Sequence, residues 1–113
     1  MQTIGIDLVE VARFLPMVDD RNHPFLKKVF TDAEVGYCFS KANSAERLAG
    51  HFAAKEAASK AFGVQEYPYI EIEVQHAPDG APELWHKGTR LNARVSISHT
   101  KDMAAAVVLG YTA

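Results

Sequence analysis

The chain has 113 residues, a formal net charge of −2 and a hydrophobic content of 48%. This length fits one compact domain, 1–113, with enough apolar residues for a core. Acids and bases are mixed along the chain, which argues against nucleic-acid or membrane-surface binding, and no apolar run approaches the roughly 20 residues of a membrane span.

The N-terminus and the single cysteine indicate the compartment. The first residues lack the basic lead and long apolar core of a signal peptide. We therefore expect a cytoplasmic protein. Cys38 cannot form an internal disulfide and lies between Tyr37 and Phe39, so we expect a buried, unreactive thiol rather than a nucleophile.

The chain opens with a predicted strand over residues 2–8. Ile4, Ile6 and Leu8 alternate with other residues, which is typical of a half-buried strand whose apolar face packs on the core. A short helix over 9–15 is expected next, ended by a proline.

Three further helical segments are expected in the first half. One covers 25–30, and the next follows Thr31, which forms a capping box with Glu34. The longest covers 44–62, is rich in Ala, Glu, Lys and Leu, and meets a C-terminal glycine cap at Gly63.

The second half is predicted to be strands joined by turns. Alternation or short apolar runs predict strands over 69–75, 83–86, 94–99 and 103–111. Helices followed by strands indicate the α+β class, a small single domain with helices packed on a mainly antiparallel sheet.

The first segment with chemical potential is Gly5-Ile6-Asp7, an acid at the end of an apolar strand. Asp7 could cap the following helix, because Asp is favoured at that position. Alternatively, Asp7 is a metal-ligand carboxylate on a rigid strand. The residues alone favour the cap.

The second segment is the helix end Phe-Ala-Ala-Lys-Glu-Ala-Ala-Ser-Lys-Ala-Phe-Gly over 52–63. Glu56 and Lys60 lie about 40° apart around the helix. They form either a surface ion pair worth a few tenths of a kcal/mol, about 0.3, or a carboxylate for a metal beside an ammonium for phosphate. Without outside information the ion pair is favoured.

The third segment is Val-Ser-Ile-Ser-His-Thr over 95–100, a strand that runs into a polar corner. His99 and Thr100 could donate to phosphate oxygens, or the cluster could simply satisfy turn amides. A hydrolase triad is excluded by the absence of a G-x-S-x-G elbow and by the opposed directions of Ser98 and His99 on a strand.

Together the three segments resemble the family of holo-acyl-carrier-protein synthases. The match runs through 5–13, 52–63 and 95–100 in the family's order and near its spacing, and Gly80-Ala81-Pro82 fits the family's Gly-x-Pro turn. The resemblance covers nearly the whole chain and reverses the preferences given above. One departure is the segment after Gly63, which is shorter than in the family and lacks its glycines, near the family's coenzyme A site.

The resemblance implies transfer of 4′-phosphopantetheine from coenzyme A to a serine of apo-acyl carrier protein, with release of adenosine 3′,5′-bisphosphate. Asp7 and Glu56 then hold Mg²⁺, which prefers oxygen ligands. Asp7, Glu56 and Lys60 are the catalytic residues, with Glu56 also the candidate base for the serine and Lys60 a point charge for phosphate.

The resemblance also implies the binding residues and the assembly. Lys60, Gly63, His99 and Thr100 bind coenzyme A, and Arg13 docks the acidic carrier protein. Arg21 is near Arg13 in the sequence and either extends that docking surface or is ordinary solvated surface. The family forms homotrimers with sites shared between neighbours, so inactive Asp7 and Glu56 variants are expected to complement when mixed.

A second reading stays open beside this one. A non-catalytic carrier-protein or coenzyme A binding module could retain the fold and lose turnover. The presence of Asp7, Glu56 and Lys60 argues against it, and the short segment after Gly63 argues for it. Carrier proteins of fatty acid and of polyketide synthesis are both open as partners.

Overall fold

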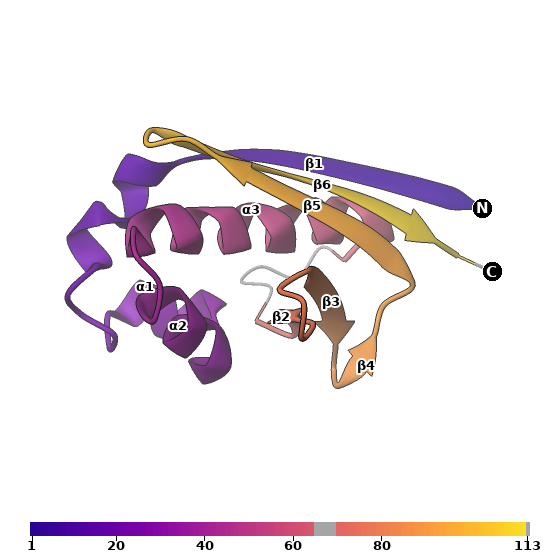
Figure 1. Ribbon diagram of the computed structural model, residues 1–113. Helices are drawn as coiled ribbons and strands as arrows, with labels where there is room; N and C mark the ends of the chain where they lie inside the picture. The colour runs from indigo at the N-terminus through magenta and orange to yellow at the C-terminus, as the bar shows by residue number, and fades with distance from the viewer. Residues whose placement is uncertain (65–69, 113) are drawn as a thin grey trace.

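A computed structural model of the chain describes residues 1–64 and 70–112 (Figure 1). The elements follow in the order β1 (Gln2–Glu10), the 3-10 helix η1 (Val11–Met17), α1 (Pro24–Val29), α2 (Asp32–Phe39), α3 (Ser44–Phe62), β2 (Ile72–His76), β3 (Pro82–His86), β4 (Thr89–Arg90), β5 (Ala93–His99) and β6 (Met103–Tyr111). This α+β architecture confirms the predicted fold class.

The strands form two antiparallel sheets with α3 between them. One sheet has the order β1-β6-β5 and the other the order β2-β3-β4. Figure 1 shows α3 running along the first sheet, with η1, α1, α2 and the second sheet on its other side. Helix α3 is therefore the central element of the fold, with other elements packed along it on both sides.

The bounds of α3 and β6 agree with the sequence prediction. Helix α3 begins after Asn43 and ends at Gly63, whose φ of 70° is the left-handed conformation that glycine adopts at low cost. The capping box of α2 is also present, with Thr31 and Glu34 each accepting the other's backbone N–H.

A glycine sets the distance between β1 and α3. A Cβ atom on Gly5 would overlap the carbonyl oxygen of Ala57, so only glycine lets the strand approach the helix backbone this closely. The close approach brings the next inward-facing residue of β1, Asp7, against the C-terminal half of α3.

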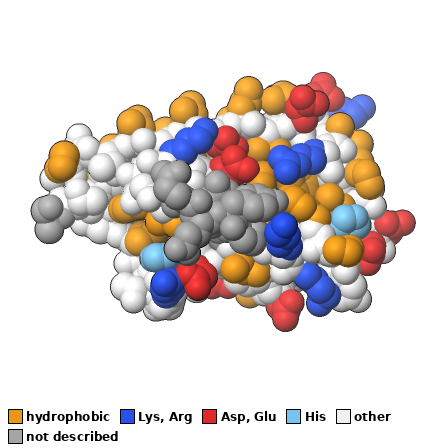
Figure 2. Space-filling view, turned by 180° about the vertical axis from the view of Figure 1, so that it is seen from behind, with side chains coloured by type: hydrophobic (Ala, Val, Ile, Leu, Met, Phe, Trp, Pro, Cys, Tyr) orange, Lys and Arg blue, Asp and Glu red, His pale blue; other side chains and the backbone are white. Residues whose placement is uncertain are grey.

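The prediction for the buried face of β1 was wrong. Ile4, Ile6 and Leu8 are 69%, 66% and 66% exposed, whereas Gly5 and Val9 face α3 and are buried. The small residues pack on the helix because α3 is alanine-rich and lies close to the sheet. Figure 2 shows hydrophobic side chains along the edge of the molecule that this sheet forms.

Three predicted boundaries also change. Strand β1 extends to Glu10, which pairs with Met103, so the following helix begins only at Val11 and includes Pro16. The strand predicted over 69–75 is β2, Ile72–His76, and residue 69 lies outside the described residues. Strand β4 has two residues and was not predicted.

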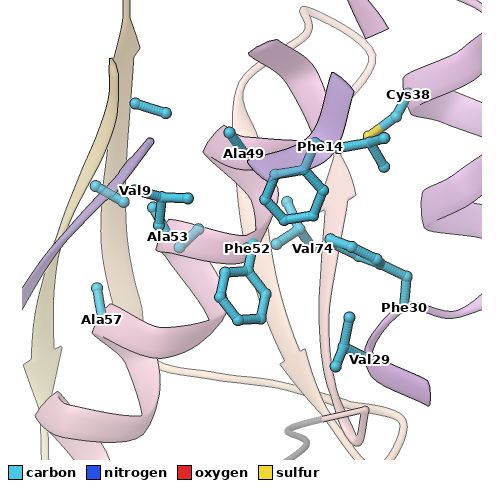
Figure 3. Close-up of a cluster of buried hydrophobic side chains, with 14 of the residues drawn as sticks. Val9, Phe14, Val29, Phe30, Cys38, Ala49, Phe52, Ala53, Ala57 and Val74 are labelled. Carbon is cyan, nitrogen blue, oxygen red and sulfur yellow. The ribbon is translucent and has the colours of Figure 1, made fainter. Parts of the chain in front are cut away.

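The core fills the space between α3 and the elements on its far side (Figure 3). Phe14, Phe30 and Phe52 are nearly fully buried, with ring centroids about 6 Å apart in tilted or edge-on pairs. Cys38 is buried among them, and burial raises the pKa of its thiol to about 12. The predicted unreactive thiol is confirmed as a buried one.

Candidate active site

Asp7 lies on the face of β1 that meets α3, with its side chain 11% exposed. Its Oδ1 is 3.2 Å from Nζ of Lys60, which also donates to the Ile6 carbonyl oxygen at 2.9 Å. The residue before η1 is Glu10, three positions further along. Asp7 therefore does not cap the helix, and that alternative is wrong.

Glu56 projects from α3 toward the same point. Burial raises the pKa of its carboxyl, and the negative charge of Asp7 and a hydrogen bond with Asp7 raise it further. That hydrogen bond exists only while one of the two carboxyl groups is protonated. Two acids share one small volume, which is unfavourable when both are ionised.

Lys60 completes this group, which we call the carboxylate cluster: Asp7, Glu56 and Lys60. The alternative that Glu56 and Lys60 form an ordinary surface ion pair does not describe the contacts, because the nearest carboxylate oxygen to the Lys60 ammonium belongs to Asp7. The Lys60 side chain is 55% exposed. Its ammonium can therefore reach an incoming anion as well as Asp7.

The carboxylate cluster fits a magnesium ion. Asp7 Oδ2 is buried and accepts no hydrogen bond from the described residues. Among those residues, no three His, Cys, Asp or Glu side chains are grouped to hold a metal by themselves. Mg²⁺ commonly binds one or two protein carboxylates and takes its other ligands from phosphates and water. Two converging carboxylates with a free oxygen match this pattern.

Arg13, predicted to dock the carrier protein, lies beside the carboxylate cluster. Its guanidinium carbon is 4.9 Å from the centre of the Phe52 ring and 5.2 Å from that of Phe25. Its charge also lowers the pKa of Glu56, against the effect of burial. Arg13 is exposed but held by these two rings, so it borders the carboxylate cluster as well as the surface.

Arg21, the second predicted docking residue, is exposed and lies 5.3 Å over the Phe39 ring. It belongs to the turn between η1 and α1. The charge of Arg21 is not among the causes that shift the pKa of Glu56. The two arginines therefore differ in their relation to the carboxylate cluster.

His99 and Thr100 lie at the other end of α3. Nδ1 of His99 is 2.9 Å from Oε1 of Glu46, in the first turn of that helix. Thr100 Oγ1 accepts the backbone N–H groups of Asp102 and Met103. Thr100 thus satisfies turn amides, as the alternative for this corner predicted.

The distance between the two groups is set by α3. Glu46 and Lys60 are 14 positions apart in the helix, which corresponds to about 21 Å along its axis. Strands β1 and β5, which carry Asp7 and His99, are the two edges of their sheet. One chain therefore carries the carboxylate cluster and the His99 corner at opposite ends of α3, and Asp7 and Glu56 both belong to the carboxylate cluster. Their contact within one chain argues against the expected complementation between Asp7 and Glu56 variants.

A cavity of about 260 Å³ adjoins the His99 end. Its lining includes Glu46 and His99 as well as Arg47, His51 and His76, which were not predicted as site residues. Nε of Arg47 is buried without a hydrogen-bond partner. Arg47 brings a positive charge to the lining of this cavity, which favours an anionic ligand.

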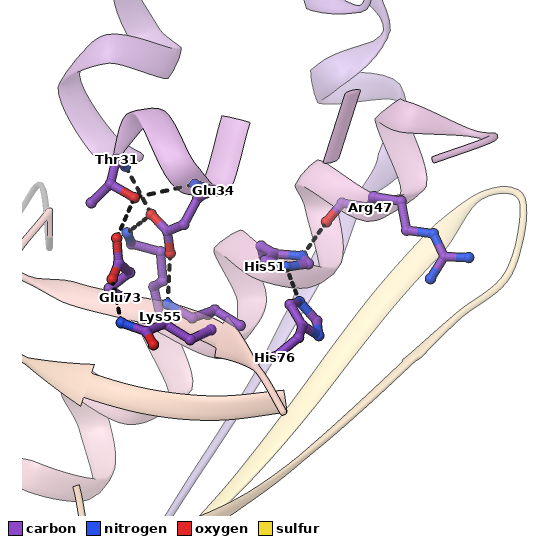
Figure 4. A network of polar contacts seen from close by, with 9 residues as sticks. Thr31, Glu34, Arg47, His51, Lys55, Glu73 and His76 are labelled. Carbon is purple, nitrogen blue, oxygen red and sulfur yellow. Dashed lines mark hydrogen bonds and ion pairs between the residues drawn. The ribbon is translucent and has the colours of Figure 1, made fainter. Parts of the chain in front are cut away.

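A buried ion pair stabilises α3 on the side opposite the β1-β6-β5 sheet (Figure 4). Nζ of Lys55 is 2.6 Å from Oε1 of Glu34, and both side chains are 0% exposed. Glu34 also accepts the backbone N–H of Val74 in β2 at 2.8 Å. Lys55 follows Leu48 and Phe52 on the apolar stripe of the helix, and this spacing was the signal that could have revealed it.

Gly63 serves as the C-terminal cap of α3 and is exposed. The short segment that follows it falls partly on residues 65–69, which lie outside the described residues.

No helix in the described part of the chain is long and apolar enough to cross a membrane.

Comparisons with known proteins agree on one family. Residues 3–109 match the 4′-phosphopantetheinyl transferase superfamily. The chain is 39% identical to a holo-[acyl-carrier-protein] synthase of Thermodesulfovibrio yellowstonii, over 96% of this chain and 97% of the relative. It is 44% identical to that of Halothermothrix orenii, over 95% and 94%.

The fold is also similar to solved structures. A holo-(acyl-carrier-protein) synthase from Bacillus anthracis str. Ames, in complex with CoA (3′,5′-ADP), superposes with a TM-score of 0.77 at 36% identity. The superposition covers 95% of this chain and 93% of the other.

Proposed function

The chain belongs to the 4′-phosphopantetheinyl transferase superfamily, and we propose that it acts as a holo-[acyl-carrier-protein] synthase. It transfers 4′-phosphopantetheine from coenzyme A to a serine of an apo-acyl carrier protein. The observation that carries the proposal is the convergence of Asp7, Glu56 and Lys60 at the contact of β1 with α3.

The carboxylate cluster assigns a role to each of its residues. Asp7 and Glu56 hold Mg²⁺, which when bound neutralises charge on the pyrophosphate. Lys60 places its ammonium against a phosphate oxygen. Glu56 accepts the serine proton, directly or through a water.

The covalent step exchanges one bond for another. The serine oxygen bonds to the phosphorus that carries pantetheine, and the bond from that phosphorus to the bridging oxygen breaks. The leaving group is adenosine 3′,5′-bisphosphate, and the serine proton passes to Glu56. The cluster lies on a strand and a helix, so these residues are held in position before substrate arrives.

A homotrimer with shared sites completes the arrangement. The carboxylate cluster and the His99 corner lie about 21 Å apart along α3, and a neighbouring copy can bring its His99 and Thr100 to the cluster of the first. The exposed side of β1 offers the contact: Ile4, Ile6 and Leu8 are two-thirds exposed. Large apolar patches of this kind mark interfaces.

The carrier protein docks on the exposed arginines. Arg13 and Arg21 present guanidinium groups at η1 and just beyond it, each over an aromatic ring. An acidic helix would find charge complementarity there. Arg13 borders the carboxylate cluster, so a serine on that helix would enter beside Glu56.

Mass spectrometry of an apo-carrier protein tests the proposal. After incubation with this protein, coenzyme A and Mg²⁺, the carrier protein should gain one phosphopantetheine group, and omission of Mg²⁺ should prevent it. Binding of coenzyme A without any gain in mass would instead identify a non-catalytic module. Absence of both would refute the assignment.

A further inference from the structure

Two histidine rings on different elements point at each other. His51 lies on α3 and is 4% exposed, and His76 ends β2. Their Nε2 atoms are 2.9 Å apart, and a dashed line in Figure 4 marks this contact. Tyr37 of α2 stacks on His76 with the ring centroids 3.8 Å apart and the planes 12° from parallel. The pair is therefore fixed by three elements.

The hydrogen bonds of this pair limit where its protons can be. Nδ1 of His51 is 2.8 Å from the Arg47 carbonyl oxygen, and Nδ1 of His76 is 3.2 Å from that of Gly80. A carbonyl oxygen only accepts, so each Nδ1 favours carrying hydrogen. If both rings were neutral in that form, two lone pairs would face each other at 2.9 Å. One hydrogen must therefore lie between the Nε2 atoms.

The neutral pair has one arrangement that costs little. The bond from His51 to Arg47 is the shorter and more buried one, so it is kept. His76 then carries its hydrogen on Nε2 and donates it to Nε2 of His51. This leaves Nδ1 of His76 without hydrogen against the Gly80 oxygen. Adding a proton at that atom creates a hydrogen bond there and moves neither ring.

Charged groups on the neighbouring elements change the pKa of the two histidines and therefore how readily the pair takes up a proton. Burial lowers the pKa of His51 to about 4 and also lowers that of His76. The cations Lys41, Arg47 and Lys55 lower one or both further. Lys55 is paired with Glu34, and Glu46 with His99. The pair is thus neutral near pH 7 until an anion arrives close by.

The cavity beside the pair can receive such an anion. Both rings line it, together with Arg47, His99 and Glu46, and the Glu46 carboxylate is 2.9 Å from Nδ1 of His99. An anion in this cavity would be attracted by Arg47 and would favour a positive charge on His76.

We propose that His51 and His76 take up a single proton, on Nδ1 of His76, when a phosphate-bearing part of coenzyme A enters this cavity. Affinity for coenzyme A therefore rises as the pH falls. This inference rests on the proposed function for the identity of the ligand. Linkage makes the effect reciprocal, because a ligand that favours the protonated pair binds that pair more tightly.

Nitrogen NMR of the histidine rings tests the pair without ligand. At pH 7.5 we expect hydrogen on Nδ1 of His51 and on Nε2 of His76, and on acidification a first proton at Nδ1 of His76. Two rings that take up protons independently over the same pH range would overturn the proposal. So would hydrogen on Nδ1 of His76 at pH 7.5.

Calorimetric titration with coenzyme A tests the coupling. Proton uptake is measured at pH 6 in two buffers that differ in ionisation enthalpy, for the wild type and His76→Gln. A glutamine amide can still donate to His51 but takes up no proton. Between pH 7.5 and 5.5, wild-type affinity should rise about fivefold more than that of the variant, and its proton uptake should be larger.

His86→Gln is the matched control, because His86 lies on β3 and does not line the cavity. It should behave as the wild type, and His99 is present in all three proteins. Equal proton uptake in wild type and His76→Gln would overturn the coupling while the proposed function stands. If the wild type bound no coenzyme A and modified no carrier protein, the coupling and the proposed function would both fail.

Discussion

Replacing Lys55 by methionine should destabilise the protein by about 3–5 kcal/mol, because it leaves a buried charge without its partner. Glu34 would keep the N–H groups of Thr31 and Val74 at 2.9 and 2.8 Å but lose the ammonium at 2.6 Å. Both side chains are fully buried, so water cannot take the place of Lys55. Urea denaturation measures the loss.

The pH dependence of this loss has a definite sign. In Lys55→Met the folded-state pKa of Glu34, already raised by burial, rises further. A raised carboxyl pKa means that the folded state holds the proton more tightly, so stability falls as the pH rises, by up to about 1.4 kcal/mol per pH unit. In Glu34→Gln the lowered pKa of Lys55 gives the opposite slope.

The double variant Glu34→Gln with Lys55→Met separates the explanations. Glutamine can still accept from Val74 or Thr31, and no buried charge remains, so most of the stability should return and the pH dependence should vanish. A single variant within about 1 kcal/mol of the wild type would refute the reasoning. Equal pH slopes in the two single variants would refute it as well.

Three further changes test the site and the assembly. Asp7→Asn should lower transfer at least about 100-fold and abolish the rise in melting temperature that Mg²⁺ gives the wild type; an unchanged Mg²⁺ response would remove Asp7 from the metal site. Ile6→Glu should yield monomers in analytical ultracentrifugation because it charges an apolar interface, and an intact trimer would place the contact elsewhere. Arg13→Gln and Arg21→Gln should each weaken carrier-protein binding about tenfold or more, as measured by titration calorimetry. Only Arg13→Gln should further raise the pKa of metal-free Glu56. Identical effects of the two variants on the pKa of Glu56 would mean that Arg13 does not act on it.

Local sequence signals correctly predicted the elements whose ends carry capping residues. Helix α3 covers Ser44–Phe62 and is capped by Gly63 as expected, because the helix propensity of its many alanines and the left-handed glycine cap agree. Alternation misjudged β1, because it shows that two faces differ but not which one meets the core. Gly5 decides that question through its approach to Ala57, and only the folded structure contains that contact.

The candidate site was likewise predictable only in part. The resemblance to a known family brought forward Asp7, Glu56 and Lys60, and these three lie together in the structure. The His51–His76 contact joins residues 25 positions apart on a helix and a strand, and no local pattern marks it. Long-range pairs of this kind depend on how α3 and β2 pack, which the sequence analysis did not determine.

The distance between the carboxylate cluster and His99 leads to a last prediction, which concerns active sites shared between subunits. Helix α3 is one unbroken element of 19 residues, so no motion within one chain can bring His99 to Asp7. If a neighbour supplies His99, then Asp7→Ala and His99→Ala chains, each inactive alone, should regain activity when co-expressed with different tags and purified as mixed oligomers. At equal amounts, random assembly in a ring gives about a quarter of the sites both intact halves.

The mixture of Asp7→Ala and Glu56→Ala is the matched control. Both carboxyls belong to the carboxylate cluster, so no combination of these two chains restores an intact pair, and the mixture should remain inactive. Recovery in the control would place Asp7 and Glu56 in different halves. An inactive Asp7→Ala and His99→Ala mixture, with mixed oligomers present, would mean that each chain completes its own site without the His99 of a neighbour.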